Sequence, residues 1–277
     1  MEKLIIEKAL SNGATDCAII SVKTILEKLT PPILDGYPQK LLYLSNPKRM
    51  DINSFFNGTK SILICIYQYW NNEKNYENKL SNISDPYEFL KSKDYRVEFI
   101  KSINKKKYRI SRYALVDEYH KKIMENLEKT LDDLKLEIKG LDGKIFVDSS
   151  PVFEKKLAAI AGLGFQGRNT LLINPEYGSY IFIGGIALSI DAEYIIPQLG
   201  EIKCGECNLC ERMCPTAALK DYKLLPSKCI SFWTTHNNEN DIPPEIINSS
   251  SYIFGCDICQ EFCPYNTKAK KAERTIF

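Results

Sequence analysis

Residues 204–215 read CGECNLCERMCP, and residues 256–264 read CDICQEFCP. Together with Cys229, these two runs hold eight of the ten cysteines in the chain. In two-cluster ferredoxins, a loop of three closely spaced cysteines wraps one iron–sulfur cluster, and a fourth cysteine before a proline ligates the other cluster. Thiolate sulfur is a soft ligand that suits iron. The spacing therefore predicts two [4Fe–4S] clusters in a bacterial ferredoxin-like domain.

The crossover pattern assigns four cysteines to each cluster. The first cluster is predicted to be held by Cys204, Cys207, Cys210 and Cys263. The second is predicted to be held by Cys214, Cys229, Cys256 and Cys259. Zinc is the alternative, but zinc ribbons place their four thiolates as two separated pairs. A disulfide framework is not favoured, because the N-terminal residues lack the apolar segment of a secretory signal.

The composition bounds the fold and the compartment. A chain of 277 residues, 44% of them hydrophobic, can form two domains. The longest apolar stretch, residues 179–190, is too short to span a bilayer. The net charge of +2 does not indicate a general nucleic-acid binder. We therefore expect a cytoplasmic protein with a first domain over residues 1–197 and a two-cluster domain over residues 198–277.

Hydrophobic periodicity predicts an α+β fold for the first domain. The expected helices cover residues 2–12, 112–136 and 151–162, the last with Ser150 as its N-cap. The expected strands cover residues 16–22, 60–69 and 144–148, and a hairpin joins 170–174 to 179–188. The polar segment 70–86 is expected to be a loop. Cys17 and Cys65 lie in apolar runs and are expected in the core.

Two further segments each allow two interpretations. Residues 161–168, AGLGFQGR, contain three glycines, which permit close approach of the backbone either to a cofactor or to a tight turn of the chain itself. Residues 91–112 carry nine basic and two acidic side chains, interleaved with aromatic residues. Such a segment can follow a phosphate backbone, or it can simply be a solvated surface.

Several motifs resemble the epoxyqueuosine reductase family, the cobalamin-dependent enzymes of the last step of queuosine synthesis in tRNA. The matching segments are 49–51, 113–114, 119–120, 147–152, 161–164, 167–175, 178–179, 229–231, 254–257 and 263–266. The resemblance implies a nitroreductase-like cobalamin-binding domain ahead of the cluster domain. It also implies that the clusters pass electrons to cobalamin, which reduces epoxyqueuosine to queuosine.

The resemblance further implies roles for individual residues. Asp148 matches the proposed acid that protonates the departing epoxide oxygen; its place after an apolar strand suggests partial burial and a raised pKa. The alternative is that Asp148 only caps the helix that follows. The residues implied to bind the cofactor are Arg112, Tyr113, His120, Gly164, Gly167, Arg168, Asn169, Thr170, Gly178 and Ser179.

The implied partners are a tRNA substrate and an external electron donor such as a flavodoxin or ferredoxin system, and we expect a monomer. The chain ends at Phe277, whereas many family members continue into a helical-repeat region that helps to hold tRNA. We therefore expect a short form in which residues 91–112 contact tRNA. The alternatives are a cobalamin-dependent reductase of a small molecule, similar to reductive dehalogenases, and an electron-transfer or binding module whose pocket holds another cofactor or nothing.

Overall fold

A four-stranded antiparallel sheet with the order β1-β2-β7-β4 forms the centre of the molecule. The computed structural model describes residues 1–277 except 71–72, 94, 96–107, 149, 197–202 and 237–241. The strands are β1 (Asp16–Ser21), β2 (Ser61–Gln68), β7 (Ile181–Leu188) and β4 (Gly143–Val147). Every residue of β2 is buried, as its continuous apolar run predicts, because β2 lies between two strands and between two helical layers.

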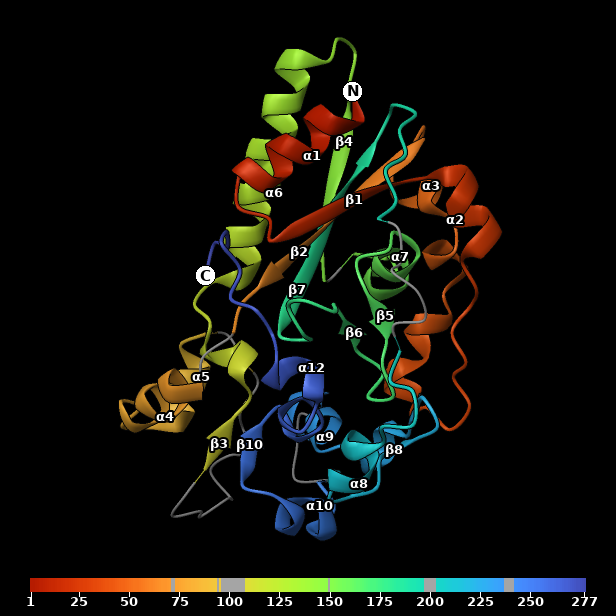
Figure 1. The fold of residues 1–277 in the computed structure, drawn as a ribbon. Helices are drawn as coiled ribbons and strands as arrows, with labels where there is room; N and C mark the ends of the chain where they lie inside the picture. The colour runs from red at the N-terminus through yellow and green to blue at the C-terminus, as the bar shows by residue number, and fades with distance from the viewer. Residues whose placement is uncertain (71–72, 94, 96–107, 149, 197–202, 237–241) are drawn as a thin grey trace.

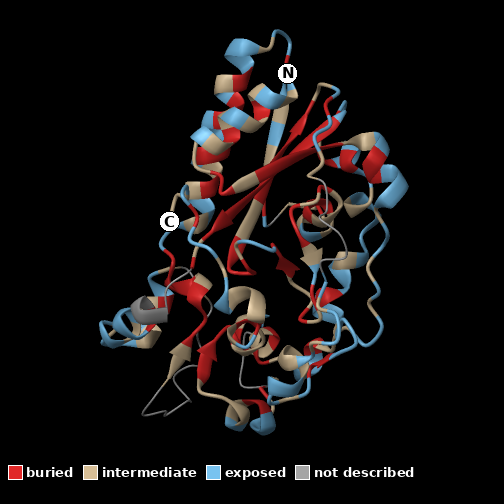
Figure 2. Cartoon of the chain, in the orientation of Figure 1, coloured by how far each residue is buried: buried red, intermediate tan, exposed pale blue. Residues whose placement is uncertain are grey.

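Helices cover both faces of the sheet (Figure 1). One face packs against α1 (Glu2–Ser11) and α6 (Tyr119–Glu137), and the other against α2 (Val22–Lys28), α3 (Ile52–Phe55) and α7 (Glu154–Ile160). Buried residues run along the sheet and the helix faces that meet it (Figure 2). Cys17 and Cys65 are cross-strand partners in this core, as predicted, with exposures of 1% and 0%.

The cluster region shares a third hydrophobic core with segments from the first half of the chain. The short strand β3 (Arg109–Ile110) pairs in parallel with β10 (Tyr252–Phe254), and this joins the two regions. Their core is enclosed by α4 (Glu73–Ser81), α5 (Pro86–Lys91), α9 (Ile230–His236) and α10 (Pro244–Ser249). The expected domain boundary near residue 197 lies outside the described residues.

The remaining elements of the cluster region are short. They are α8 (Leu209–Met213), α11 (Ile258–Glu261), α12 (Pro264–Thr267) and a hairpin of β8 (Leu219–Lys220) and β9 (Lys223–Leu224). The tail then returns to the central sheet, where the Ala272 N–H donates to Gln68 Oε1 at 2.8 Å. Every helix in the described ranges is too short or too polar to cross a membrane.

Three predicted elements were wrong in their limits or their type. Helix α6 begins at Tyr119 rather than residue 112, because Glu118 has a φ of +48° and residues 112–115 form a separate 3₁₀ turn. Helix α7 begins at Glu154, with Phe153 rather than Ser150 at its N-cap. Helix α4 occupies much of the expected 70–86 loop, because Tyr76 and Leu80, one turn apart, both contact the third core.

The glycine-rich segment forms a tight turn against the chain itself. A Cβ atom on Gly164 would lie 2.4 Å from the Ile173 carbonyl oxygen, and one on Gly167 would lie 2.4 Å from Ile173 Cδ1. These contacts arise because β5 (Phe165–Gln166) pairs with β6 (Leu172–Ile173). The turn between Asn174 and Gly178 forms as predicted, but β7 then pairs with β2 and β4 rather than completing a hairpin with residues 170–174.

Candidate active site

The four cysteines predicted for the first cluster line one cavity of about 370 Å³. Cys204, Cys207 and Cys210 belong to the first run, and Cys263 reaches the same cavity from the N-terminus of α12. The Arg168 N–H donates to Cys204 Sγ at 3.4 Å. A cavity that combines four thiols with nearby N–H donors suits an iron–sulfur cluster, since hydrogen bonds to the sulfurs tune its potential.

The other four cysteines lie close enough to influence one another electrostatically. Burial raises the pKa of Cys229, and Cys214 adds to the effect. Burial likewise raises the pKa of Cys256 and Cys259, with Cys229 contributing to both. Raised pKa values favour the protonated thiols of Cys229, Cys256 and Cys259, so metal binding by these three releases protons.

Asp148 lies directly after β4, beside the start of α6. Its Oδ2 accepts a hydrogen bond from Tyr119 Oη at 3.2 Å and is 3.2 Å from His120 Nε2. The side chains of Asp148 and His120 are 64% and 48% exposed, so both remain accessible. The structure thus brings together two predicted site residues that are 28 positions apart in the sequence.

The acid–base character of Asp148 differs from the prediction. The hydrogen bond from His120 lowers the pKa of Asp148, and this effect outweighs the burial that opposes it. The expected raised pKa was therefore wrong, and the carboxyl is ionised at neutral pH. The helix-cap alternative was also wrong, because the N-cap of α7 is Phe153 and no side chain caps the helix. A proton delivered through Asp148 must come from a neighbouring group.

His236, at the end of α9, is a neighbour of Asp148 that the sequence analysis did not assign to the site. Its ring stacks on Phe232 at 5.6 Å, and its Nδ1 is 2.8 Å from Thr235 Oγ1. Burial lowers the pKa of His236, and the charge of Asp148 opposes that shift. His236 follows Cys229 by seven residues, about two helical turns, so both lie on one side of the helix. This spacing is the signal in the sequence that could have placed His236 near the site.

Arg112, expected to contact the cofactor, is instead 1% exposed and enclosed by carboxylates. Its Nη1 lies 3.0 Å from Asp257 Oδ2 and 2.8 Å from Glu261 Oε1. Tyr113, the next residue, packs between Tyr95 and Phe254. The Arg112 side chain therefore joins β3 to the cysteine motif that contains Asp257, which is a structural contact between the two regions.

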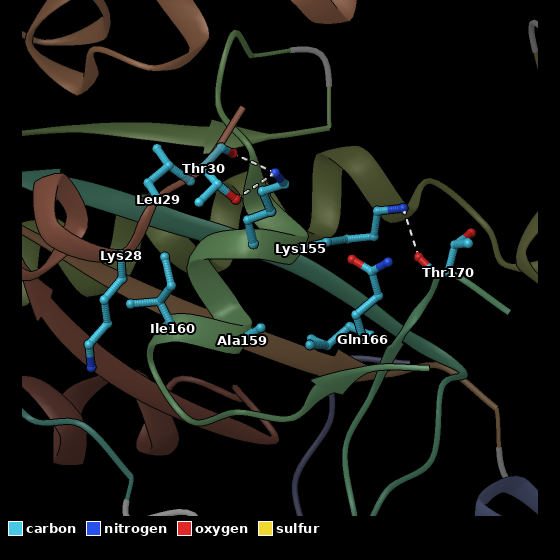
Figure 3. A pocket seen from close by; sticks show the side chains of 10 residues that line it. Lys28, Leu29, Thr30, Lys155, Ala159, Ile160, Gln166 and Thr170 are labelled. Carbon is cyan, nitrogen blue, oxygen red and sulfur yellow. Dashed lines mark hydrogen bonds between the residues drawn. The ribbon is translucent and has the colours of Figure 1, made fainter. Parts of the chain in front are cut away.

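The remaining residues predicted to bind the cofactor fall in three places. Arg168 and Asn169 line the cavity of the first four cysteines. Gly178 and Ser179 pack on Asn266, whose Oδ1 accepts from the Ser179 N–H at 2.6 Å. Thr170 lines a separate hollow of about 250 Å³ beside α7, where its carbonyl accepts from Lys155 Nζ at 3.2 Å (Figure 3).

Comparison with known proteins agrees with this geometry. Residues 203–266 match the family model described as "4Fe-4S double cluster binding domain", and residues 49–149 match "Epoxyqueuosine reductase QueG, DUF1730". The epoxyqueuosine reductase of Cyclobacterium marinum is 32% identical over 281 residues, covering 99% of this chain and 82% of the relative.

Two solved structures share the fold over about two thirds of their own length. A Bacillus subtilis epoxyqueuosine reductase, described with its catalytic aspartate loop swung out of the active site, superposes with a TM-score of 0.70 at 23% identity, covering 98% of this chain and 68% of that one. An epoxyqueuosine reductase bound to an epoxyqueuosine-modified tRNA stem loop superposes with a TM-score of 0.66 at 22% identity, covering 98% and 67%.

The cysteine arrangement and the cluster-domain match define an iron–sulfur protein with two [4Fe–4S] clusters. Its sequence relatives identify the family. The chain belongs to the epoxyqueuosine reductase family and is an oxidoreductase.

Proposed function

We propose that this protein reduces epoxyqueuosine to queuosine in tRNA, with electrons passing through the two clusters to a bound cobalamin. The observation that carries the proposal is the accessible Asp148–His120 pair at the edge of the sheet, in a chain of this family that also holds eight clustered cysteines. A solved relative described with an epoxyqueuosine-modified tRNA stem loop supports the substrate class.

The residues present suit a corrinoid. Its rim of amides and its phosphodiester need hydrogen-bonding partners, and Lys155, Gln166 and Thr170 offer them in the hollow beside α7 (Figure 3). That hollow holds only a part of such a cofactor. One ring nitrogen of each histidine has a partner in the protein: His120 Nε2 is 3.2 Å from Asp148 Oδ2, and His236 Nδ1 is 2.8 Å from Thr235 Oγ1. When bound and reduced, cobalamin supplies an electron-rich cobalt centre that reduces the epoxide.

The chain's own residues supply the protons. Conversion of an epoxide to an alkene and water consumes two electrons and two protons, and the first proton neutralises the oxygen as the first C–O bond breaks. Asp148 is ionised, so it acquires that proton from His120 Nε2, which lies 3.2 Å from Oδ2. Tyr119 Oη orients the same oxygen. His120 is half-exposed and regains its proton from water.

The loop that carries Asp148 is part of the proposal. The Bacillus subtilis relative is described with its catalytic aspartate loop swung out of the active site. We propose that Asp148 and residues 150–153 of this chain have the same freedom, and that the position of Asp148 in the structure is its working position.

A mass-spectrometric assay tests the function. Epoxyqueuosine-containing tRNA would be incubated anaerobically with reconstituted protein and a reductant, then digested and analysed. The wild type should form queuosine, and Asp148→Asn should slow it by about 10²–10⁴-fold, the usual contribution of a general acid. The control Asp142→Asn alters an exposed carboxylate at the other end of β4 and should leave the rate unchanged.

The outcomes separate the parts of the proposal. Persistence of epoxyqueuosine with wild-type protein that has bound cobalamin would contradict the tRNA substrate and favour a small-molecule reductase. Absence of corrinoid binding would contradict the cofactor. Full activity of Asp148→Asn would remove this carboxyl from the reaction.

We also propose that an external flavodoxin- or ferredoxin-type protein donates the electrons. The protein is proposed to be a monomer with two domains, 1–197 and 198–277. The basic segment 91–112, proposed to contact tRNA, lies largely outside the described residues. Within its described part, Arg109 and Arg112 pair with Glu261, and Lys93 pairs with Asp117. These three cations are already compensated, so the lysines of residues 101–107 must provide most of the contact.

A further inference from the structure

Asp148 holds an unfavourable backbone conformation in its working position. Its φ is +49°, in the left-handed region that is unfavourable for a residue other than glycine. Strain of this kind persists only where surrounding contacts hold it. The carboxylate contacts with Tyr119 and His120 are exposed, and exposed pairs contribute little. A further contact must therefore fix the backbone of this loop.

Glu154 supplies a contact to the Asp148 backbone itself. Glu154 is the first residue of α7, and its carboxyl accepts a hydrogen bond from the Asp148 N–H. Its Oε1 is buried and has no hydrogen-bond partner among the described residues. Within the described residues, the hydrogen bond from the Asp148 N–H is therefore the contact that ties the buried Glu154 carboxyl to this loop.

The charges around Glu154 determine its ionisation. The groups that face it are Asp148, Arg49 and Lys155. Arg49 Nη1 is directed mainly to the Ser150 and Val152 carbonyls, each at 3.4 Å, and Lys155 to the Thr170 carbonyl. Burial and the negative charge of Asp148 raise the pKa of Glu154 to about 8, and together they outweigh the hydrogen bond from the Asp148 N–H and the two cations, which favour the ionised form. At neutral pH it is therefore a neutral group beside an ionised one.

We propose that Glu154 is a positioning residue whose neutral carboxyl latches the Asp148 loop in its working position, and that loss of the Glu154 proton releases the loop. The inference rests on the proposed function. An ionised Glu154 would place a second negative charge beside the Asp148 carboxylate, and two like charges in a partly buried site repel. The position of Asp148 therefore depends on the proton of the Glu154 carboxyl, which the reaction does not consume.

The sign of the pH effect follows from the raised pKa. A carboxyl with a raised folded-state pKa gives its full stabilisation below its ordinary pKa and loses it as pH rises through the folded value. For Glu154 this window runs from 4.5 to about 8. The loop should be held at pH 6–7 and released above pH 8, so turnover should decline on the alkaline side.

Two variants and a control test the latch. In Glu154→Gln the amide keeps a neutral acceptor for the Asp148 N–H but does not titrate, and in Glu154→Ala the contact is lost. The control Glu125→Gln changes an exposed carboxylate of α6. Backbone amide exchange of residues 148–153, corrected for intrinsic rates and followed by mass spectrometry in the cluster-loaded protein, reads the loop without any need for turnover. The kcat and KM of the holoenzyme, measured between pH 6 and 10, show how release of the loop affects catalysis.

Wild type and Glu125→Gln should lose protection of the loop, and kcat, as pH rises past about 8. Glu154→Gln should keep both at pH 9, with its neutral-pH kcat within about threefold of wild type. Glu154→Ala should lack protection at every pH and lose about tenfold or more in kcat with little change in KM. Loss of protection in Glu154→Gln at the same pH as in wild type would overturn the latch, as would full protection in Glu154→Ala. If the proposed function fails, wild type shows no turnover, yet the exchange result still decides the latch.

Discussion

The Arg112–Asp257 pair and the His120–Asp148 pair each join a basic side chain to a carboxylate at nearly the same distance, 3.0 and 3.2 Å. They differ in their access to water. Arg112 and Asp257 are 1% and 0% exposed, whereas His120 and Asp148 are 48% and 64% exposed. A desolvated ion pair has to stay paired, because either partner alone would be a buried charge. An exposed pair can exchange its proton with water, which suits a reaction.

The carboxylate of the buried pair also accepts more hydrogen bonds than the carboxylate of the exposed pair. Asp257 accepts from the Arg112 backbone N–H at 2.7 Å and from the Ser111 hydroxyl, in addition to the guanidinium. Glu261 accepts from Arg112 and from Tyr252 Oη at 2.9 Å. Both carboxylates lie within the second cysteine run, so this network fixes that run against β3. Burial, rather than pair distance, separates the contact that joins the two regions from the one that we propose handles protons.

The largest expected effect comes from breaking the buried pair. Arg112→Met fills most of the space but leaves Asp257 and Glu261 without their shared cation, and removal of one partner of a buried pair costs about 3–5 kcal/mol. Anaerobic denaturant unfolding of the cluster-loaded protein would measure this loss. The control Lys135→Met removes one partner of the exposed pair with Asp142 and should cost less than about 1 kcal/mol. Equal losses in the two variants would contradict the role given to burial.

The same contrast explains which features could be predicted from the sequence. The strand Ser61–Gln68 and the thiols of the first cysteine run follow from local patterns, since neighbouring residues provide the signal. Arg112 lies in a basic segment that looks exposed, and the partner that buries it is 145 positions away. The pKa of Asp148 likewise depends on where α6 docks, because its strand alone suggests burial without His120. The features that the sequence did not predict are therefore those that depend on contacts between residues far apart in the chain.

A second variant tests whether Asp148 contributes to the fold at all. In Asp148→Gly the left-handed φ is no longer strained, and the relief of about 1–2 kcal/mol exceeds the added chain entropy of about 0.5–1 kcal/mol. We expect a small gain in the free energy of unfolding, below about 1 kcal/mol, together with loss of queuosine formation. A loss of stability as large as that of Arg112→Met would show that the exposed pair holds the structure and would remove the distinction between the two pairs.

The smallest effect should come from His120→Gln, and salt distinguishes it from the others. The lowered pKa of Asp148 means that its stabilising contact is present at pH 6 and is lost only as pH falls through that lowered value. Because the pair is exposed, its removal should cost less than about 1 kcal/mol in dilute buffer. The difference from wild type should vanish at 1 M salt, where the Debye length falls to about 3 Å. Unfolding at pH 6 in low and high salt would measure this, with Arg112→Met keeping its deficit at both. A salt-independent deficit in His120→Gln would mean that the pair is shielded from solvent and would put it in the same class as Arg112–Asp257.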